Sequence, residues 1–168
     1  MATSLIIRAA QQIVLNADSH QTEMQMIFTE LKSEEFDSTF NLLKESKLDV
    51  SDLKQANIRL FRLEENGETI GVGGLEIFSD QALLRSIAIR KEFQGKGLGK
   101  ELVEQIESAA KESGISALYL LTNTAADFFK SIGYQTIQRD DFAEQLKQTS
   151  QFSGLCPISA ICMMKVIL

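Results

Sequence analysis

The 168-residue sequence contains no tryptophan, one histidine, one proline and two cysteines. His20, Cys156 and Cys162 are too few for a zinc site or a disulfide framework, so we expect no metal. No apolar run approaches the ~20 residues of a membrane span, which predicts no membrane partner. The start of the chain is a poor match to a signal or transit peptide. These absences favour a cytoplasmic protein with reduced thiols.

Positive charge is also scarce, because 17 Lys and Arg stand against 23 Asp and Glu, for a net charge of -6 at pH 7. A general nucleic-acid binder needs a broad basic face, so we expect no nucleic-acid partner. Apolar residues make up 44% of the chain, as in ordinary globular proteins. A chain of this length forms one domain and buries roughly 70% of the surface of its unfolded state.

The first twenty residues stand apart from this domain. Ile6, Ile7, Ala10, Ile13 and Val14 lie on one face of a helix, if a helix forms. A docking helix and a frayed terminal extension are equally compatible with this pattern. We therefore divide the chain into an N-terminal extension, residues 1–20, and one domain, residues 21–168.

The remaining patterns alternate between strands and helices. Strands are predicted at 24–31, 57–65, 68–78, 81–89, 116–122, from 134, and at 158–168; helices are predicted from 33, at 98–114, before Gly133, and at 139–152. Asn66-Gly67 is a preferred type I′ hairpin turn. The strand–helix–strand portion from 81 to 122 is a parallel crossover within an otherwise antiparallel sheet. The predicted fold class is mixed α+β, with one mostly antiparallel, twisted sheet and flanking helices.

A cluster of glycine and lysine follows the strand at 81–89. Residues 94–100 read QGKGLGK, and we call this segment the glycine knot. Glycines allow backbone N–H groups to converge on one point, and the N-terminus of the following helix adds unpaired donors, so the knot can hold a phosphate or pyrophosphate. The alternative is a flexible turn with solvated lysines. The spacing fits neither a Walker P-loop nor a dinucleotide-binding fingerprint.

Two motifs carry a resemblance to the GNAT superfamily of N-acetyltransferases. The first is Gln/Arg-x-x-Gly-x-Gly/Ala, met by Gln94, Gly97 and Gly99 directly after the strand LLRSIAI. The second is LLTNTAADFFKSIGY, which resembles the family's segment ending in Gly-Phe/Tyr. The tail QTSQFSGLCPISA, together with LLRSIAI and LYLLT, more narrowly resembles the arsenic-resistance and phosphinothricin-like N-acetyltransferases.

The resemblance implies acetyl-CoA as the donor substrate, with a splayed parallel pair of strands around the thioester. It places the pyrophosphate on the knot and the pantetheine along one strand edge. The implied donor-binding residues are Ile87, Ala88, Ile89, Gln94, Gly95, Lys96, Gly97, Leu98, Gly99, Lys100, Thr122, Thr124, Phe128 and Phe129.

Transfer of the acetyl group to an amine needs a base that takes the amine's proton and a proton donor for the departing thiolate. Glu76 is our first candidate for the base, because an acid inside an apolar strand either points into a cleft or sits on a solvated face. At the position where many members of the family carry a proton-donating tyrosine, this chain has Phe129, which cannot donate. Water, Tyr119 or Thr122 then supplies the proton, or the thiolate leaves unprotonated.

Arg85 and Ser86 are predicted to face the gap between the splayed strands. Arginine there would grip the carboxylate of an acceptor through two parallel hydrogen bonds; the alternative is an exposed arginine on an edge.

The leading hypothesis is direct acetyl transfer from acetyl-CoA to the primary amine of a small, amino-acid-like acceptor. The alternatives are a peptide or protein N-acetyltransferase and a catalytically inactive acyl-CoA sensor. A homodimer through the apolar C-terminal strand is a further expectation.

Overall fold

The computed structural model describes residues 11–14, 25–55 and 57–168. Within these residues the chain forms one eight-stranded sheet in the order β1-β2-β3-β4-β5-β6-β8-β7. The strands are β1 (Gln11–Val14), β2 (Gln25–Glu30), β3 (Ile58–Glu65), β4 (Glu68–Phe78), β5 (Gln81–Ile89), β6 (Ala117–Thr122), β7 (Gln135–Ile137) and β8 (Ile161–Val166). Only the β5–β6 pair is parallel among these neighbours. The predicted mixed α+β class, with one parallel strand pair, is confirmed.

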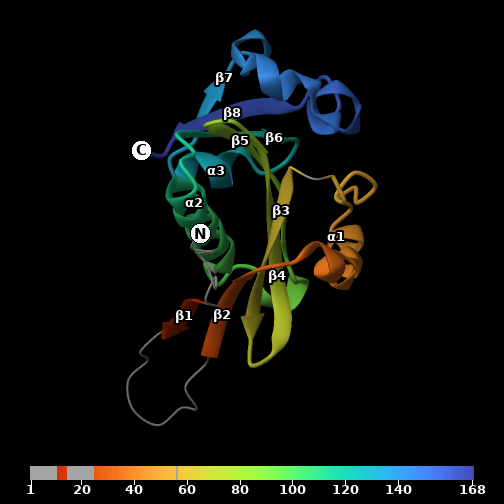
Figure 1. Cartoon of the computed structure of the whole chain (residues 1–168), viewed down its shortest axis with the longest axis vertical. Helices are drawn as coiled ribbons and strands as arrows, with labels where there is room; N and C mark the ends of the chain where they lie inside the picture. Colours follow the sequence, from red (N-terminus) through yellow and green to blue (C-terminus); the bar gives the residue numbers. More distant parts are fainter. Residues whose placement is uncertain (1–10, 15–24, 56) are drawn as a thin grey trace, which may run out of the picture.

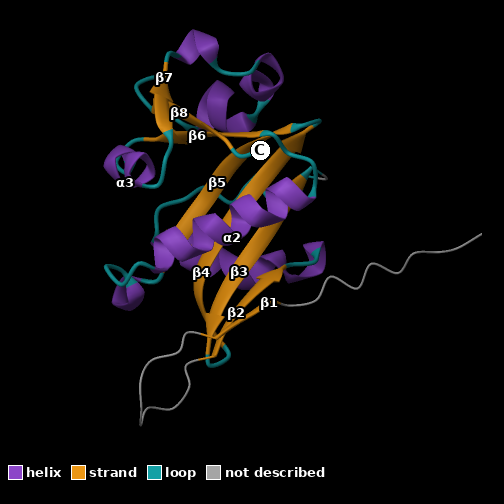
Figure 2. Cartoon of the chain, turned by 90° about the vertical axis from the view of Figure 1, so that its left-hand side faces the viewer, coloured by secondary structure: helices purple, strands orange, loops and turns teal. Residues whose placement is uncertain are grey.

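Helices cover both faces of the sheet. Helix α2 (Leu98–Glu112) crosses one face and α1 (Phe40–Glu45), which continues a 3-10 turn at Ser33–Thr39, lies on the other (Figures 1 and 2). The short helix α3 (Ala126–Ser131) precedes β7. The segment from 139 to 152 was predicted as helical. In its place are short 3-10 turns at Arg139–Asp141 and Glu144–Gln148 and a π turn at Gln151–Leu155.

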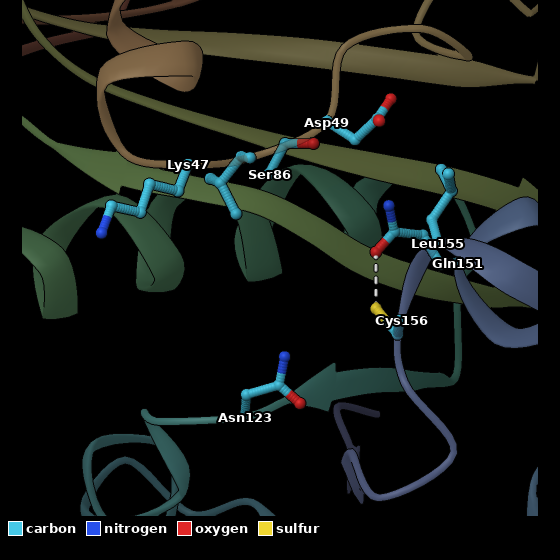
Figure 3. Close-up of a pocket in the computed structure, with 8 residues that line it drawn as sticks. Lys47, Asp49, Ser86, Asn123, Gln151, Leu155 and Cys156 are labelled. Carbon is cyan, nitrogen blue, oxygen red and sulfur yellow. Dashed lines mark hydrogen bonds between the residues drawn. The ribbon is translucent and has the colours of Figure 1, made fainter.

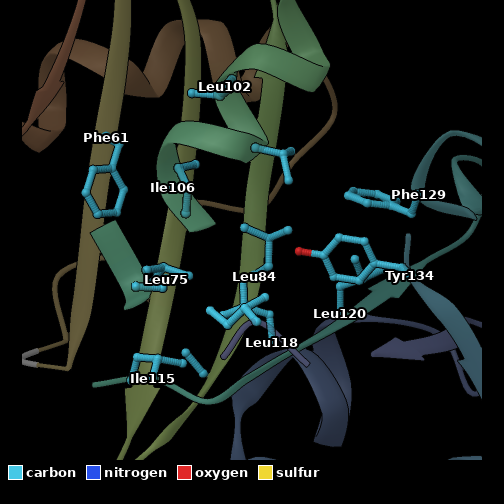
Figure 4. Close-up of a cluster of buried hydrophobic side chains, with 14 of the residues drawn as sticks. Phe61, Leu75, Leu84, Leu102, Ile106, Ile115, Leu118, Leu120, Phe129 and Tyr134 are labelled. Carbon is cyan, nitrogen blue, oxygen red and sulfur yellow. The ribbon is translucent and has the colours of Figure 1, made fainter. Parts of the chain in front are cut away.

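Three apolar clusters hold these layers together. The largest lies under α2 and includes Leu84 of β5, Leu120 of β6 and the aromatic pair Phe129 and Tyr134 (Figure 4). A second cluster packs α1 and the loop after it against β3 to β5, and a third packs the 139–155 segment against β6 and β8. The sheet is therefore covered on its second face by two separate segments.

The sharp turns fall where the sequence predicts them. Asn66 and Gly67, between β3 and β4, both have positive φ angles of 50° and 82°, as a type I′ hairpin requires. Helix α2 ends before Gly114, at φ 81°, and α3 ends before Gly133, at φ 99°.

Strands β5 and β6 pair over only three residues. The parallel register runs from Gln81 opposite Ala117 to Leu83 opposite Tyr119, and beyond it the two strands have no mutual pairing. Strand β6 takes β8 as its other neighbour along its whole length. The splay implied by the resemblance is therefore present, and it opens toward the end of β5 that leads into the glycine knot.

One expectation needs correction. Gln11–Val14 is a strand paired with β2, and not part of a docking helix; the rest of the 1–20 extension lies outside the described residues. The central residues of β8 pair with β6 on one side and β7 on the other, while Ile161 and Val166 of the same strand are exposed. A homodimer stays a prediction without an assigned surface.

Candidate functional site

The glycine knot presents free backbone donors. Gly95 and Gly97 have φ angles of 76° and 81°, a conformation that favours glycine. In the described chain no hydrogen bond joins the amides of residues 95–100 to another protein group; the first is the Glu101 amide, which donates to the Gly97 carbonyl. The knot is therefore an exposed set of N–H groups at the N-terminus of a 15-residue helix, which suits an anion.

Neighbouring side chains hold the knot in place. The side-chain amide of Gln94 donates to the backbone carbonyl of Ile89 at 2.9 Å, and this bond attaches the knot to the end of β5. The ring of Phe128, on α3, lies 3.5 Å from where a Cβ on Gly99 would stand, so the two motifs of the sequence meet here. Thr122 accepts a hydrogen bond from the Ala125 amide at 3.0 Å and so supports the start of α3.

A β-bulge lies on β5 at the splay. Gly74 pairs with Arg85 and Val72 with Ala88, so two β5 residues, Ser86 and Ile87, oppose one residue of β4. Ser86 has a φ of 55°, in the left-handed region. From the bulge to Ile89, the β5 edge facing β6 has no strand partner in the described residues. The backbone N–H and C=O groups of this edge can therefore form hydrogen bonds with an extended ligand.

A cavity of about 400 Å³ opens beside the bulge on the face that carries α1. Figure 3 shows Asn123, which follows β6, across the opening from Ser86. Its lining is mostly polar and consists of Lys47, Leu48, Asp49, Ser86, Asn123, Gln151, Leu155 and Cys156. The knot begins the helix on the opposite face, so an anion site and a polar cavity flank the same splay.

Two groups of the cavity titrate away from their usual ranges. Hydrogen bonds from the side chain and backbone of Ser51 lower the pKa of Asp49, so its carboxylate stays charged. Burial raises the pKa of the Cys156 thiol, which donates to Gln151 at 3.2 Å. Cys156 is therefore a neutral hydrogen-bonding group at pH 7 and not an activated nucleophile.

Arg85 and Glu76 form a buried ion cluster with Asp52. Arg85 donates to both carboxylate oxygens of Asp52, at 2.8 and 2.6 Å, and to Glu76 at 2.8 Å. Burial alone would lower the pKa of Arg85, but the hydrogen bonds and charges of the two carboxylates outweigh it and raise that pKa. Neither expected setting of Glu76, a cleft or a solvated face, is found, because its side chain is 2% exposed and paired.

Arg85 is likewise not exposed on an edge, and its guanidinium already holds two carboxylates. Its predicted grip on an acceptor would need Asp52 to give up both hydrogen bonds. Of the two predicted acceptor-binding residues, only Ser86 lines the cavity.

Of the two predicted proton donors, Tyr119 is set back from the splay, whereas Thr122 ends β6 beyond the residues that pair with β5. Tyr119 lies where β5 and β6 are still paired, and its ring meets Phe142 edge-on at 5.1 Å between centroids. Phe129 is buried and packs against Phe128 and Tyr134. Burial, with Glu107 nearby, raises the pKa of Tyr134, so its hydroxyl keeps its proton.

Most of the residues that line the cavity were not predicted from the sequence. Asn123 had a usable signal, since it directly follows a buried strand at the open end of the splay. Lys47 and Asp49 come from a polar stretch with no motif, and Cys156 comes from the tail that carried only the narrower family resemblance. Thr124 is exposed, and nothing in its contacts assigns it a role.

Neither a metal cluster nor a membrane helix is found among the described residues. There, no three His, Cys, Asp or Glu side chains group as metal ligands. No helix in that part of the chain combines the length and apolar character needed to cross a bilayer.

Comparison with known proteins agrees with this fold. Residues 56–136 match the family model of the acetyltransferase (GNAT) domain. The chain is 32% identical over 87 residues to an uncharacterised N-acetyltransferase of Chlorobaculum tepidum, covering 51% of this chain and 56% of that protein. It is 34% identical over 74 residues to an amino-acid acetyltransferase of Pseudomonas putida, covering 43% of this chain and 17% of the relative. The match identifies residues 56–136 of the chain as a GNAT acetyltransferase domain.

Solved structures share the fold at low sequence identity. N-acetylglutamate synthase from Neisseria gonorrhoeae, complexed with coenzyme A and N-acetyl-glutamate, superposes with a TM-score of 0.72 at 19% identity, over 85% of this chain and 35% of that one. The ribosomal-protein-S18-alanine N-acetyltransferase from Escherichia coli superposes with a TM-score of 0.63 at 17% identity, over 84% of this chain and 94% of that one. The narrower resemblance to arsenic-resistance enzymes stays a prediction.

Proposed function

We propose that the protein is an acetyl-CoA-dependent N-acetyltransferase that acts, in a ternary complex, on the primary amine of a small, amino-acid-like acceptor. The observation that carries this proposal is the splay between β5 and β6, with free amides of the glycine knot on one side and a polar cavity on the other. A donor bound to the knot and an acceptor in the cavity would meet at the bulge.

The knot suits the donor because its charge compensation comes chiefly from backbone N–H groups. An acidic protein can therefore hold a pyrophosphate without a broad basic surface. The unpaired edge of β5 near Ile87 to Ile89 suits the amide groups of pantetheine, which can add to the strand in the manner of a further β-strand.

The cavity suits a small acceptor that is both charged and rich in hydrogen-bonding groups. Lys47 and Asp49 bring one charge of each sign, while Ser86, Asn123 and Gln151 bring neutral donors and acceptors. The relatives named amino-acid acetyltransferase support this class of acceptor.

Transfer forms a C–N bond and breaks the C–S bond, while the amine loses a proton and the sulfur leaves as a thiolate. Backbone N–H groups near Ile87 would stabilise the developing charge on the carbonyl oxygen. Because Glu76 is buried and does not line the cavity, the amine's proton would reach its carboxylate only through water. Water or the Thr122 hydroxyl protonates the thiolate, since Phe129 cannot and Tyr119 lies among the paired residues.

The test is acetylation of an amine panel by the full chain, followed by mass spectrometry of the products. The panel contains amino acids, phosphinothricin, polyamines and short peptides. Acetylation of amino-acid-like amines above hydrolysis supports the proposal. Preference for peptide N-termini supports the peptide N-acetyltransferase instead, and tight acetyl-CoA binding with no product from any amine supports the sensor.

A further inference from the structure

The buried ion cluster of Arg85, Asp52 and Glu76 joins two consecutive strands to a loop that is distant in the chain. Arg85 is on β5, Glu76 on the neighbouring β4, and Asp52 in the loop between α1 and β3. The side chain of Arg85 is 1% exposed, that of Glu76 2% and that of Asp52 7%. Removing such charges from water costs several kcal/mol per ion, so the cluster needs a reason other than stability.

The position of the cluster, beside the cavity, suggests such a reason. Arg85 directly precedes Ser86, the bulge residue that lines the cavity. Asp52 lies three residues after Asp49, in the loop whose residues 47–49 form another wall of the same cavity. The two hydrogen bonds between Arg85 and Asp52 therefore connect one wall of the cavity to another.

Other contacts of this loop keep it folded without fixing that connection. Leu53 is fully buried in the cluster under α1, and Leu48 and Val50 pack against the same cluster. The backbone hydrogen bonds of the loop around Asp52 close local turns; for example, the Leu53 amide donates to the Val50 carbonyl at 3.3 Å. Asp52 and Arg85 are thus the polar link from the cavity's loop to the bulge.

We propose that Arg85 is a positioning residue of the acceptor cavity, which holds the 47–52 loop against the β5 bulge through Asp52. The proposal rests on the proposed function, because it assigns the cavity to the acceptor. It replaces the direct grip on the acceptor that the sequence suggested for Arg85. Acceptor affinity then depends on Asp52, a residue that does not line the cavity.

Asp52→Asn is the cleaner variant. Replacing Arg85 with a neutral residue would leave two buried carboxylates without a cation and destabilise the fold. Asp52→Asn leaves Arg85 paired with Glu76, so no buried charge loses its partner. Asparagine has one oxygen acceptor and cannot reproduce the two-oxygen contact. Arg85→Lys is the conservative second variant, since an ammonium cannot engage both carboxylates in the same planar geometry.

The chain offers a matched control in Arg59 and Glu30. Arg59 makes the same two-bond contact with Glu30, at 2.7 Å for each bond, between β3 and β2 and outside the cavity lining. Arg59→Lys therefore weakens a two-bond ion pair that does not touch the cavity's loop, although its side chains are less buried, at 17% and 21% exposed.

Three quantities are measured: acceptor KM, acetyl-CoA Kd, and hydrogen exchange of residues 46–53. For Asp52→Asn we expect acceptor KM to rise roughly tenfold, with acetyl-CoA Kd within about twofold of wild type and exchange of 46–53 faster. Arg85→Lys should change the same quantities in the same direction, and Arg59→Lys should change none of them.

Two outcomes overturn the proposal: unchanged exchange and acceptor KM in Asp52→Asn, or equal losses for donor and acceptor, which indicate general destabilisation. If the wild type acetylates no amine, the proposed function fails, and hydrogen exchange alone still decides whether Arg85 and Asp52 hold the loop.

Discussion

The backbone geometry of the glycine knot leads to a sharp prediction for Gly97→Val. Gly97 has a φ of 81°, and a Cβ there would meet no atom within 4 Å, so the penalty comes from the backbone alone. The left-handed conformation costs an ordinary residue about 1–2 kcal/mol, and a β-branched residue more. If the knot relaxes to avoid this cost, its amides cease to converge. We expect acetyl-CoA Kd to rise at least about tenfold, which corresponds to ~1.4 kcal/mol.

Lysine in the knot should matter less. Lys96 is exposed, and its ammonium lies 5.1 Å from the centre of the Phe93 ring. An exposed charge near a helix N-terminus contributes about 0.3–1 kcal/mol, so Lys96→Ala should weaken acetyl-CoA binding by only about two- to fivefold. Isothermal titration calorimetry with acetyl-CoA measures both variants.

Gly114 is the matched control for backbone strain. It has the same φ of 81°, equally free space around its missing Cβ, and a place just beyond the C-terminal end of the same helix. Gly114→Val should lower the melting temperature as Gly97→Val does, yet leave acetyl-CoA Kd unchanged. Equal losses of binding in the two glycine variants, or a loss in Lys96→Ala as large as in Gly97→Val, would refute the backbone site.

Three further predictions concern the acceptor side and the proton transfers. Asn123→Ala should raise acceptor KM about three- to tenfold through one lost hydrogen bond, with acetyl-CoA Kd unchanged by calorimetry. Tyr119→Phe should change kcat by less than about twofold, because its ring lies among paired strands; a tenfold loss in steady-state rate would make it the proton donor. Burial raises the pKa of the Cys156 thiol, so the neutral form is favoured on folding. The Cys156 thiol therefore makes its full contribution to the free energy of unfolding below the unfolded thiol pKa of about 8.5. This contribution is lost as pH rises through the higher pKa of the folded state. Iodoacetamide should accordingly label Cys156 more slowly than a free thiol at pH 8, measured by peptide mass spectrometry, and acceptor should slow it further.

The donor half of the site was predictable because it is local in the chain. The knot, the strand before it and the helix after it are consecutive, and each has its own signal: glycine spacing, alternating apolar residues and a helical stripe. The bulge was not predictable, since Ser86 gives no sign of a positive φ in the sequence. Asp52 could not be paired with Arg85, because the two are 33 residues apart and no periodic pattern relates them.

The acceptor half is built differently, and this has a consequence for selectivity. Its walls come from the loop after α1, the β5 bulge, the end of β6 and the turn at Gln151–Leu155, and most of the lining side chains belong to loops. Substitution of a lining side chain such as Asn123 leaves the knot's amides untouched, because the knot depends on backbone conformation. Acceptor choice can therefore change without loss of the donor site.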